Sequence, residues 1–291
     1  GGSYIVSKEN FGRRPALLAA ACLVIDYIMT VTVSVSSSTA AIVAAFPQLL
    51  DHKIGISLVC VLLITVINLR GVSESSKVFG IPTYAFILSM GALIVTGFIK
   101  LMTGTIGAVD YSPQQLAATM PSKELSELSL FLILRAFSSG CSALTGVEAV
   151  SNAIPTFKEP SQKTANHVLY LLGGIIIFVF GGTSILATVL KVIPQHGATV
   201  LSQMAGVIFG KGVMFFALQV TTSLILLLAA NTAYNGLPIL LSLLAKDRYM
   251  PRQFGQRGTK LSFSNGIMFI LIVSSILLIA FKADTHKLIP F

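Results

Sequence analysis

The sequence predicts an all-α membrane protein that crosses the bilayer seven times. Hydrophobic residues make up 54% of its 291 residues and charged residues only 11%, whereas soluble domains carry about 25% charged residues. The apolar residues gather in runs, and a spanning helix needs about 20 such residues in a row. The predicted spans cover approximately residues 15–47, 54–69, 80–102, 129–155, 167–191, 207–245 and 263–281.

Composition also excludes several classes of function. The net charge of +9 could indicate a nucleic-acid partner, but the basic residues lie in short loops between apolar runs, which is typical of membrane topology. We therefore expect contact with membrane lipids and no nucleic-acid partner. The sequence contains no Ser/His/Asp arrangement, metal-ligand cluster or phosphate-binding glycine loop, so it predicts no enzyme and no cofactor.

The loops alternate in charge, which predicts the orientation. Twelve lysines and arginines lie before the first segment and after the second, fourth and sixth segments, against seven in the other loops. Because basic loops stay in the cytoplasm, the N-terminal end should be cytoplasmic and the C-terminal end outside. The sequence thus indicates a multi-pass protein of the cell membrane.

The first segment carries a polar strip. Its 33 residues would rise about 50 Å, so we expect a strongly tilted helix with Asp26 well inside the hydrocarbon. Thr30 and Ser34 follow Asp26 at helical spacing, with Tyr27 beside them. A carboxylate there is costly and indicates function, and such oxygens suit a hard cation or a relayed proton. The hydroxyls alone could equally serve helix contacts, the role expected of Ser36, Ser37, Ser38 and Thr39.

The fourth segment contains small and polar residues that a lipid-facing helix would not need. Gly140 and Gly146 bracket this run, and Thr145 and Glu148 are three residues apart. A helix broken here would expose carbonyls and a new N-terminus to an ion or an anionic group. Close helix packing through small residues would explain the glycines but not Glu148.

The later segments contain residues that we interpret as structural. In the fifth segment, Gly173-Gly174 and Gly181-Gly182 are typical of helix contacts. In the sixth, Asn231, Asn235 and Pro238 predict a kink and helix-to-helix hydrogen bonds rather than a ligand site.

Four motifs together resemble the amino acid–polyamine–organocation (APC) superfamily of permeases, and within it most nearly the KimA-type bacterial potassium importers. They are Ile-Asp-Tyr at 25–27, GCSALTGVEAVSN at 140–152, ANTAYN at 230–235 and LAKDRYMP at 244–251. The resemblance implies a LeuT-type fold with a 5+5 inverted repeat and a location in the bacterial inner membrane. The seven segments would be helices three to nine, so the fold would be incomplete, as the first two helices and the last would be missing. Such a single-domain fragment, residues 1–291, is expected to be inactive alone.

The resemblance also implies a site. Potassium would be held by Tyr27, Thr30, Ser34 and Thr145, with Asp26 and Glu148 as acidic residues of the site or of a proton path. The leading hypothesis is a secondary transporter that imports potassium by alternating access, with H⁺ as the coupling ion.

Other hypotheses stay open. An amino-acid permease of the same superfamily, with proton-coupled uptake, is the alternative. A noncatalytic membrane sensor or assembly subunit belongs to a different class. The sequence does not fix the oligomeric state, and it is compatible with a homodimer.

Overall fold

The computed structural model describes residues 2–70, 76–105, 107, 109, 130, 133–134, 137, 140, 161–193, 195, 197–256 and 263–288. These residues are mainly helical. Among them, Gln195 and Ala198 form an isolated β-bridge. The α-helices are α1 (Gly2–Phe11), α2 (Arg13–Ala45), α3 (Lys53–Leu69), α4 (Ser76–Met102), α8 (Ser161–Val189), α9 (Val200–Phe209), α10 (Val213–Lys246), α11 (Ser264–Ala280) and α12 (Thr285–Leu288). The short 3₁₀ helices are η1 (Pro47–His52) and η5 (Arg252–Gly255). The all-α prediction is thereby confirmed for the described part.

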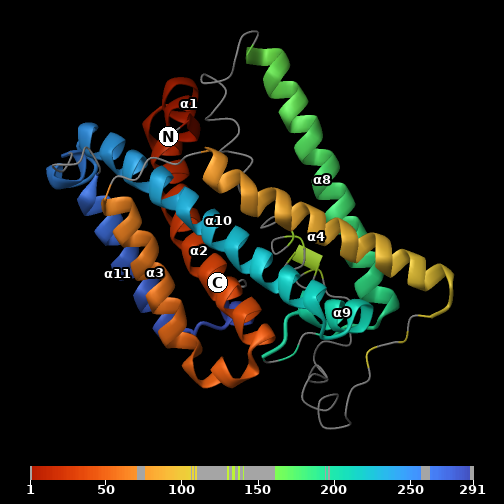
Figure 1. Cartoon of the computed structure of the whole chain (residues 1–291). Helices are drawn as coiled ribbons and strands as arrows, with labels where there is room; N and C mark the ends of the chain where they lie inside the picture. Colours follow the sequence, from red (N-terminus) through yellow and green to blue (C-terminus); the bar gives the residue numbers. More distant parts are fainter. Residues whose placement is uncertain are drawn as a thin grey trace.

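Helices α2 and α10 cross at the centre of the molecule (Figure 1). Near the end of α2, Ser38 and Ser223 form a hydrogen bond, with their Oγ atoms 2.8 Å apart. At the start of α2, the Arg13 guanidinium lies 4.9 Å from the centre of the Tyr249 ring, just beyond α10. Residue numbers therefore rise along α2 as they fall along α10, so the two helices are antiparallel.

One hydrophobic core joins α2 and α10 to α1, α3 and α11. Val31 and Val35 of α2, Leu237 of α10 and Ile270 of α11 are completely buried in it. Helices α3 and α11 lie side by side on one flank of the central pair (Figure 1). Between membrane helices such close packing stabilises through van der Waals contacts rather than through removal of apolar surface from water, so these helices should form a stable scaffold.

A second core lies on the other flank, where α4, α8 and α9 contact one another (Figure 1). Leu93 of α4, Leu186 of α8 and Ala205 of α9 are completely buried there. Phe215 and Leu218, near the start of α10, belong to the same core. Helix α10 therefore contributes to both cores.

Five spans in the described part are long and apolar enough to cross a membrane: Arg13–Ala45, Pro47–Leu69, Gly80–Met102, Gln162–Val189 and Val213–Lys246. The predicted segment 54–69 was short, and η1 extends it to a span of 23 residues. Helix α11 is apolar but has only 17 residues. The predicted segment 129–155 lies mostly outside the described residues, so a polytopic membrane protein is shown and the number seven stays a prediction.

The predicted segment 207–245 corresponds to α10, but its first residues belong to the end of α9 and to the connection between the two helices. The structure has two helices, α9 and α10, separated at Gly210 to Gly212. Gly210 has a φ of 66°, which glycine adopts without the steric cost that other residues bear. Because apolar residues lie on both sides of these glycines, hydropathy did not predict the boundary between the two helices.

Glycines allow close approach at several helix crossings. An ideal Cβ on Gly182 of α8 would lie 2.8 Å from Cγ2 of Ile94. One on Gly266 of α11 would lie 2.9 Å from Cα of Pro238. Gly173, Gly174 and Gly181, which the sequence also assigned to helix contacts, have no atom of the described residues within 4 Å of an ideal Cβ. The helix-contact interpretation is therefore supported for Gly182, and for the other three glycines of α8 it stays a prediction.

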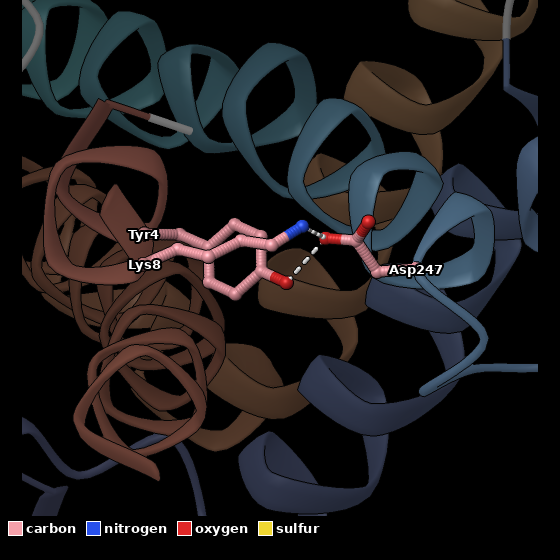
Figure 2. Close-up of polar contacts among 3 residues, drawn as sticks. All are labelled: Tyr4, Lys8 and Asp247. Atoms are coloured by element: carbon pink, nitrogen blue, oxygen red, sulfur yellow. Dashed lines mark hydrogen bonds and ion pairs between the residues drawn. The ribbon is translucent and has the colours of Figure 1, made fainter. Parts of the chain in front are cut away.

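A small polar cluster connects helix α1 to the end of α10. Figure 2 shows Tyr4 and Lys8 of α1 converging on one oxygen of Asp247. The Tyr4 hydroxyl donates to Oδ2 at 2.5 Å and the Lys8 ammonium at 2.7 Å. Tyr4 is 1% exposed, whereas 46% of the Lys8 side chain is exposed. This cluster lies at the end of the bundle that the charge pattern assigns to the cytoplasm.

The cluster shifts the pKa of both acids in it. Hydrogen bonds from Lys8 and Tyr4 hold the pKa of Asp247 below its usual value, because both favour the carboxylate. Burial and the Asp247 carboxylate raise the pKa of Tyr4. A lowered native pKa means that the contribution of Asp247 to stability is complete above its unfolded pKa of about 4, and is lost as pH falls through the lowered value.

Replacing Gly266 by alanine should destabilise the fold by about 1–3 kcal/mol, because the methyl group would meet the backbone of Pro238. Gly91→Ala in α4 is the control, since nothing lies within 4 Å of its Cβ position and alanine favours the helix. The melting temperature of the purified protein in detergent measures both. Equal melting temperatures for the two variants would contradict the close α10–α11 contact.

Removing the Tyr4 hydroxyl should cost more stability than removing the Lys8 charge. Tyr4→Phe loses a hydrogen bond to a charged group from a buried position, worth about 1.5–3 kcal/mol. Lys8→Ala removes an exposed ion pair worth at most about 1 kcal/mol. At pH 7 the melting temperature should fall more in Tyr4→Phe than in Lys8→Ala, and this difference should disappear in an Asp247→Ala background, which has no side-chain acceptor at position 247. The reverse order would refute the assigned roles.

Candidate functional site

The polar strip on α2 passes from the surface into the scaffold. Because α2 is helical without interruption, residues four apart lie on the same face. The side chain of Asp26 is exposed, those of Tyr27 and Thr30 are half-buried, and Ser34 is buried. The strip thus places three hydroxyl-bearing side chains on one side of α2 at the margin of the first core, with the carboxylate on the exposed side.

Asp26 lies on an exposed face of α2, and its predicted depth in the hydrocarbon stays a prediction. Asp26 is exposed, as is its neighbour Ile25, which is 60% exposed. Its position along the helix gives its depth in the bilayer, but only the neighbouring helices decide whether its face is covered. The exposed carboxylate lies beside the half-buried hydroxyls instead of among core residues.

Tyr27 packs against the backbone of α10. An ideal Cβ on Gly236 would lie 2.6 Å from Cε1 and from Cζ of Tyr27, and 2.8 Å from its phenol oxygen. The phenol oxygen is therefore placed by a helix more than 200 residues away in the chain. Gly236 was not among the predicted site residues, because its role depends on a contact with Tyr27 of a distant helix.

Most of the second predicted wall, on the fourth segment, lies outside the described residues. Gly140 is helical and exposed, and no atom of the described residues lies within 4 Å of its Cβ position. Thr145, Gly146 and Glu148 lie outside the described residues. The proposed helix break and the approach of Thr145 and Glu148 to α2 remain predictions.

Other polar residues of α2 hold the scaffold together. Ser36 donates to the carbonyl oxygen of Ala283 at 2.6 Å. Ser38 bonds to Ser223, and Thr39 accepts a hydrogen bond from Ser57 at 2.9 Å. For Ser36, Ser38 and Thr39, the predicted helix-contact role is confirmed.

Two polar pairs connect α3 and α10. The Asn68 side-chain amide donates to Oδ1 of Asn231 at 2.6 Å. The hydroxyls of Thr65 and Tyr234 are 2.9 Å apart in a buried position. Hydrogen bonds of this kind join transmembrane helices, so the structure agrees with the structural interpretation of Asn231.

A cavity of about 560 Å³ lies at the opposite end of the bundle from the Asp247 cluster. Its polar and charged lining includes Lys53, Thr222, Lys282, Asp284 and Thr285. None of Asp26, Tyr27, Thr30 and Ser34 lines it. The polar strip and this cavity are therefore separate features.

Metal binding by a cluster of His, Cys, Asp or Glu has no support in the described residues, where no group of three such side chains is close enough together. The oxygen-rich strip on α2 contains a single carboxylate. Its chemistry suits a weakly held monovalent cation better than a divalent metal, which prefers several carboxylates.

Comparison with known proteins gives two matches. A family sequence model described as amino acid permease matches residues 1–286. The potassium transporter KimA of Bacillus subtilis (strain 168) is 47% identical over 290 residues, which is 100% of this chain and 47% of that protein. The chain thus spans about half the length of the curated relative that it matches.

Asn231→Ala should lower stability without changing the affinity for a transported ion. The loss of its contact with Asn68 is expected to cost about 0.6–1.7 kcal/mol, the range for hydrogen bonds between membrane helices. Thr232→Ala is the control, because Thr232 is exposed and bonds to Ala229 of its own helix. Melting temperature and uptake KM are measured in the full-length protein. A raised KM with an unchanged melting temperature would place Asn231 in the site instead.

Proposed function

This chain belongs to the amino acid permease family, and we propose that it is part of a secondary transporter that imports potassium. The observation that supports this most directly is 47% identity along the whole chain to a potassium transporter. The polar strip on α2 would form one wall of the ion site.

The strip has the chemistry that a transported potassium ion needs. Tyr27, Thr30 and Ser34 offer neutral oxygens, which can replace the water around K⁺ without holding it too strongly. Their burial increases from Tyr27 and Thr30 to Ser34. An ion that leaves water would therefore meet oxygens set against a packed wall, and Thr145 would add a ligand from the opposite side.

Proton coupling would require a carboxylate whose pKa changes when the ion site fills. Asp26 lies next to Tyr27 and one helical turn from Thr30, on the exposed side of the strip. A cation bound at the hydroxyls would disfavour a proton on this carboxylate, because like charges repel. Glu148 is the second candidate, and H⁺ would be the coupling ion.

An amino acid is the alternative substrate, and the family description favours it. In that case backbone amides at a broken helix would hold the substrate carboxylate. The two hypotheses differ in which solutes compete for uptake, so one assay can separate them.

The test is potassium uptake by the full-length protein in proteoliposomes, with and without a pH gradient. Thr30→Val keeps the shape of the side chain but removes its oxygen, and should raise the KM for K⁺ about tenfold, a loss of about 1.4 kcal/mol. Thr32→Val is the matched control, because Thr32 is buried on the same helix and its hydroxyl donates to the carbonyl oxygen of Ile28, one turn earlier in that helix. Its KM should stay within about twofold.

Two outcomes would overturn the proposal. An unchanged KM for K⁺ in both Thr30→Val and Asp26→Asn would reject the site. Uptake of amino acids that K⁺ does not affect, together with no uptake of K⁺, would reject potassium as the substrate. Loss of the pH-gradient effect in Asp26→Asn would support Asp26 as the coupling group.

A further inference from the structure

The contact between Tyr27 and Gly236 leaves room for hydrogen only. Ordinary contacts between carbon atoms are about 3.5–4.0 Å long, whereas a Cβ at position 236 would lie 2.6 Å from two ring carbons of Tyr27. The same atom would lie 2.8 Å from the phenol oxygen. An alanine here would force either α10 or the ring to move by about 1 Å.

Helix α10 has no free space on its other side. Pro238 is two residues after Gly236, about 200° around the helix, and so faces almost the opposite way. There Gly266 of α11 comes so close that an ideal Cβ would be 2.9 Å from Cα and from Cβ of Pro238. Helix α10 is therefore held between α2 and α11 at this turn.

The ring of Tyr27 can be displaced at less cost than helix α10. It is half-buried, so one side of it is not enclosed by the scaffold. A half-buried side chain can change rotamer at less cost than a helix can shift against a close-packed neighbour. A larger residue at position 236 would consequently push the phenol away from α10.

We infer that Gly236 is a positioning residue for the phenol oxygen of Tyr27, and through it for the transported cation. This rests on the proposed function, in which Tyr27 is a potassium ligand. Gly236 does not contact the ion. It allows the ring to rest on the α10 backbone, and this contact fixes the oxygen relative to Thr30 and Ser34.

Displacing one ligand changes affinity and selectivity together. Potassium, rubidium and smaller cations differ in the ligand distances that they prefer, and the number and placement of oxygens distinguish between them. A general packing defect would instead reduce the amount of folded transporter. The KM for K⁺ and the K⁺/Rb⁺ preference therefore separate positioning from simple packing.

The experiment compares Gly236→Ala with Gly91→Ala, whose Cβ would meet nothing within 4 Å. Uptake of K⁺ and Rb⁺ is measured with the full-length protein in proteoliposomes that contain equal amounts of folded protein. Gly236→Ala should raise the KM for K⁺ by about tenfold or more and change the K⁺/Rb⁺ preference, since misplacement by 1 Å is costly at a site. The Vmax of Gly236→Ala should stay within about twofold of the unmodified protein. For Gly91→Ala, both the KM and the Vmax should stay within about twofold.

A double-mutant cycle tests whether Gly236 acts through Tyr27. In a Tyr27→Ala background the ring is absent, so adding Gly236→Ala should change the KM by less than about twofold. If Gly236→Ala alone does not fold, the double variant should recover folded protein. If the effects of the two substitutions on the KM multiply, or if the double variant does not recover folded protein, Gly236 acts on packing and the inference is overturned.

Tyr27→Phe distinguishes a failure of the positioning inference from a failure of the proposed potassium site. If this variant raises the KM for K⁺ while Gly236→Ala does not, the positioning inference fails and the potassium site stands. If Tyr27→Phe leaves the KM unchanged, Tyr27 is not a ligand, and both its place in the site and the inference are wrong.

Discussion

The antiparallel packing of α2 against α10 is the constraint on which the rest of the structure depends. Ser38 meets Ser223 near one end of the pair, and Tyr27 meets Gly236 in the middle. At the other end, Arg13 stacks on Tyr249. Because these contacts are spread over the whole length of the pair, neither helix can slide or rotate without breaking several of them, so the polar strip keeps a fixed relation to α10.

Hydropathy predicted the helices well where apolar runs ended at charged or polar loops, as at Arg13 and Leu69. It placed the start of α10 too early, because apolar residues flank the short break at Gly210 to Gly212, whose cause is backbone conformation. The length of a helix also predicts how deep Asp26 lies but not which way it faces. That direction depends on contacts between residues far apart in sequence.

The same limit explains the candidate site. Tyr27, Thr30 and Ser34 could be selected because hydroxyls at helical spacing beside a carboxylate form a pattern within one segment. Gly236 could not, because its role is visible only when Tyr27 of another helix lies against it. The sequence predicted structural roles for Ser38 and Asn231, and their hydrogen bonds are indeed to neighbouring helices.

The arrangement of the strip fits a transporter better than a tight cation-binding protein. Transport requires an ion to bind well enough to leave water and weakly enough to be released. Neutral hydroxyls against the scaffold can meet the first need, while the single carboxylate, Asp26, stays at the exposed edge. A carboxylate in that position can sense the charge of a bound ion and exchange protons without becoming the ion's main ligand. Separating these two roles would let proton binding and potassium binding influence each other while both remain reversible.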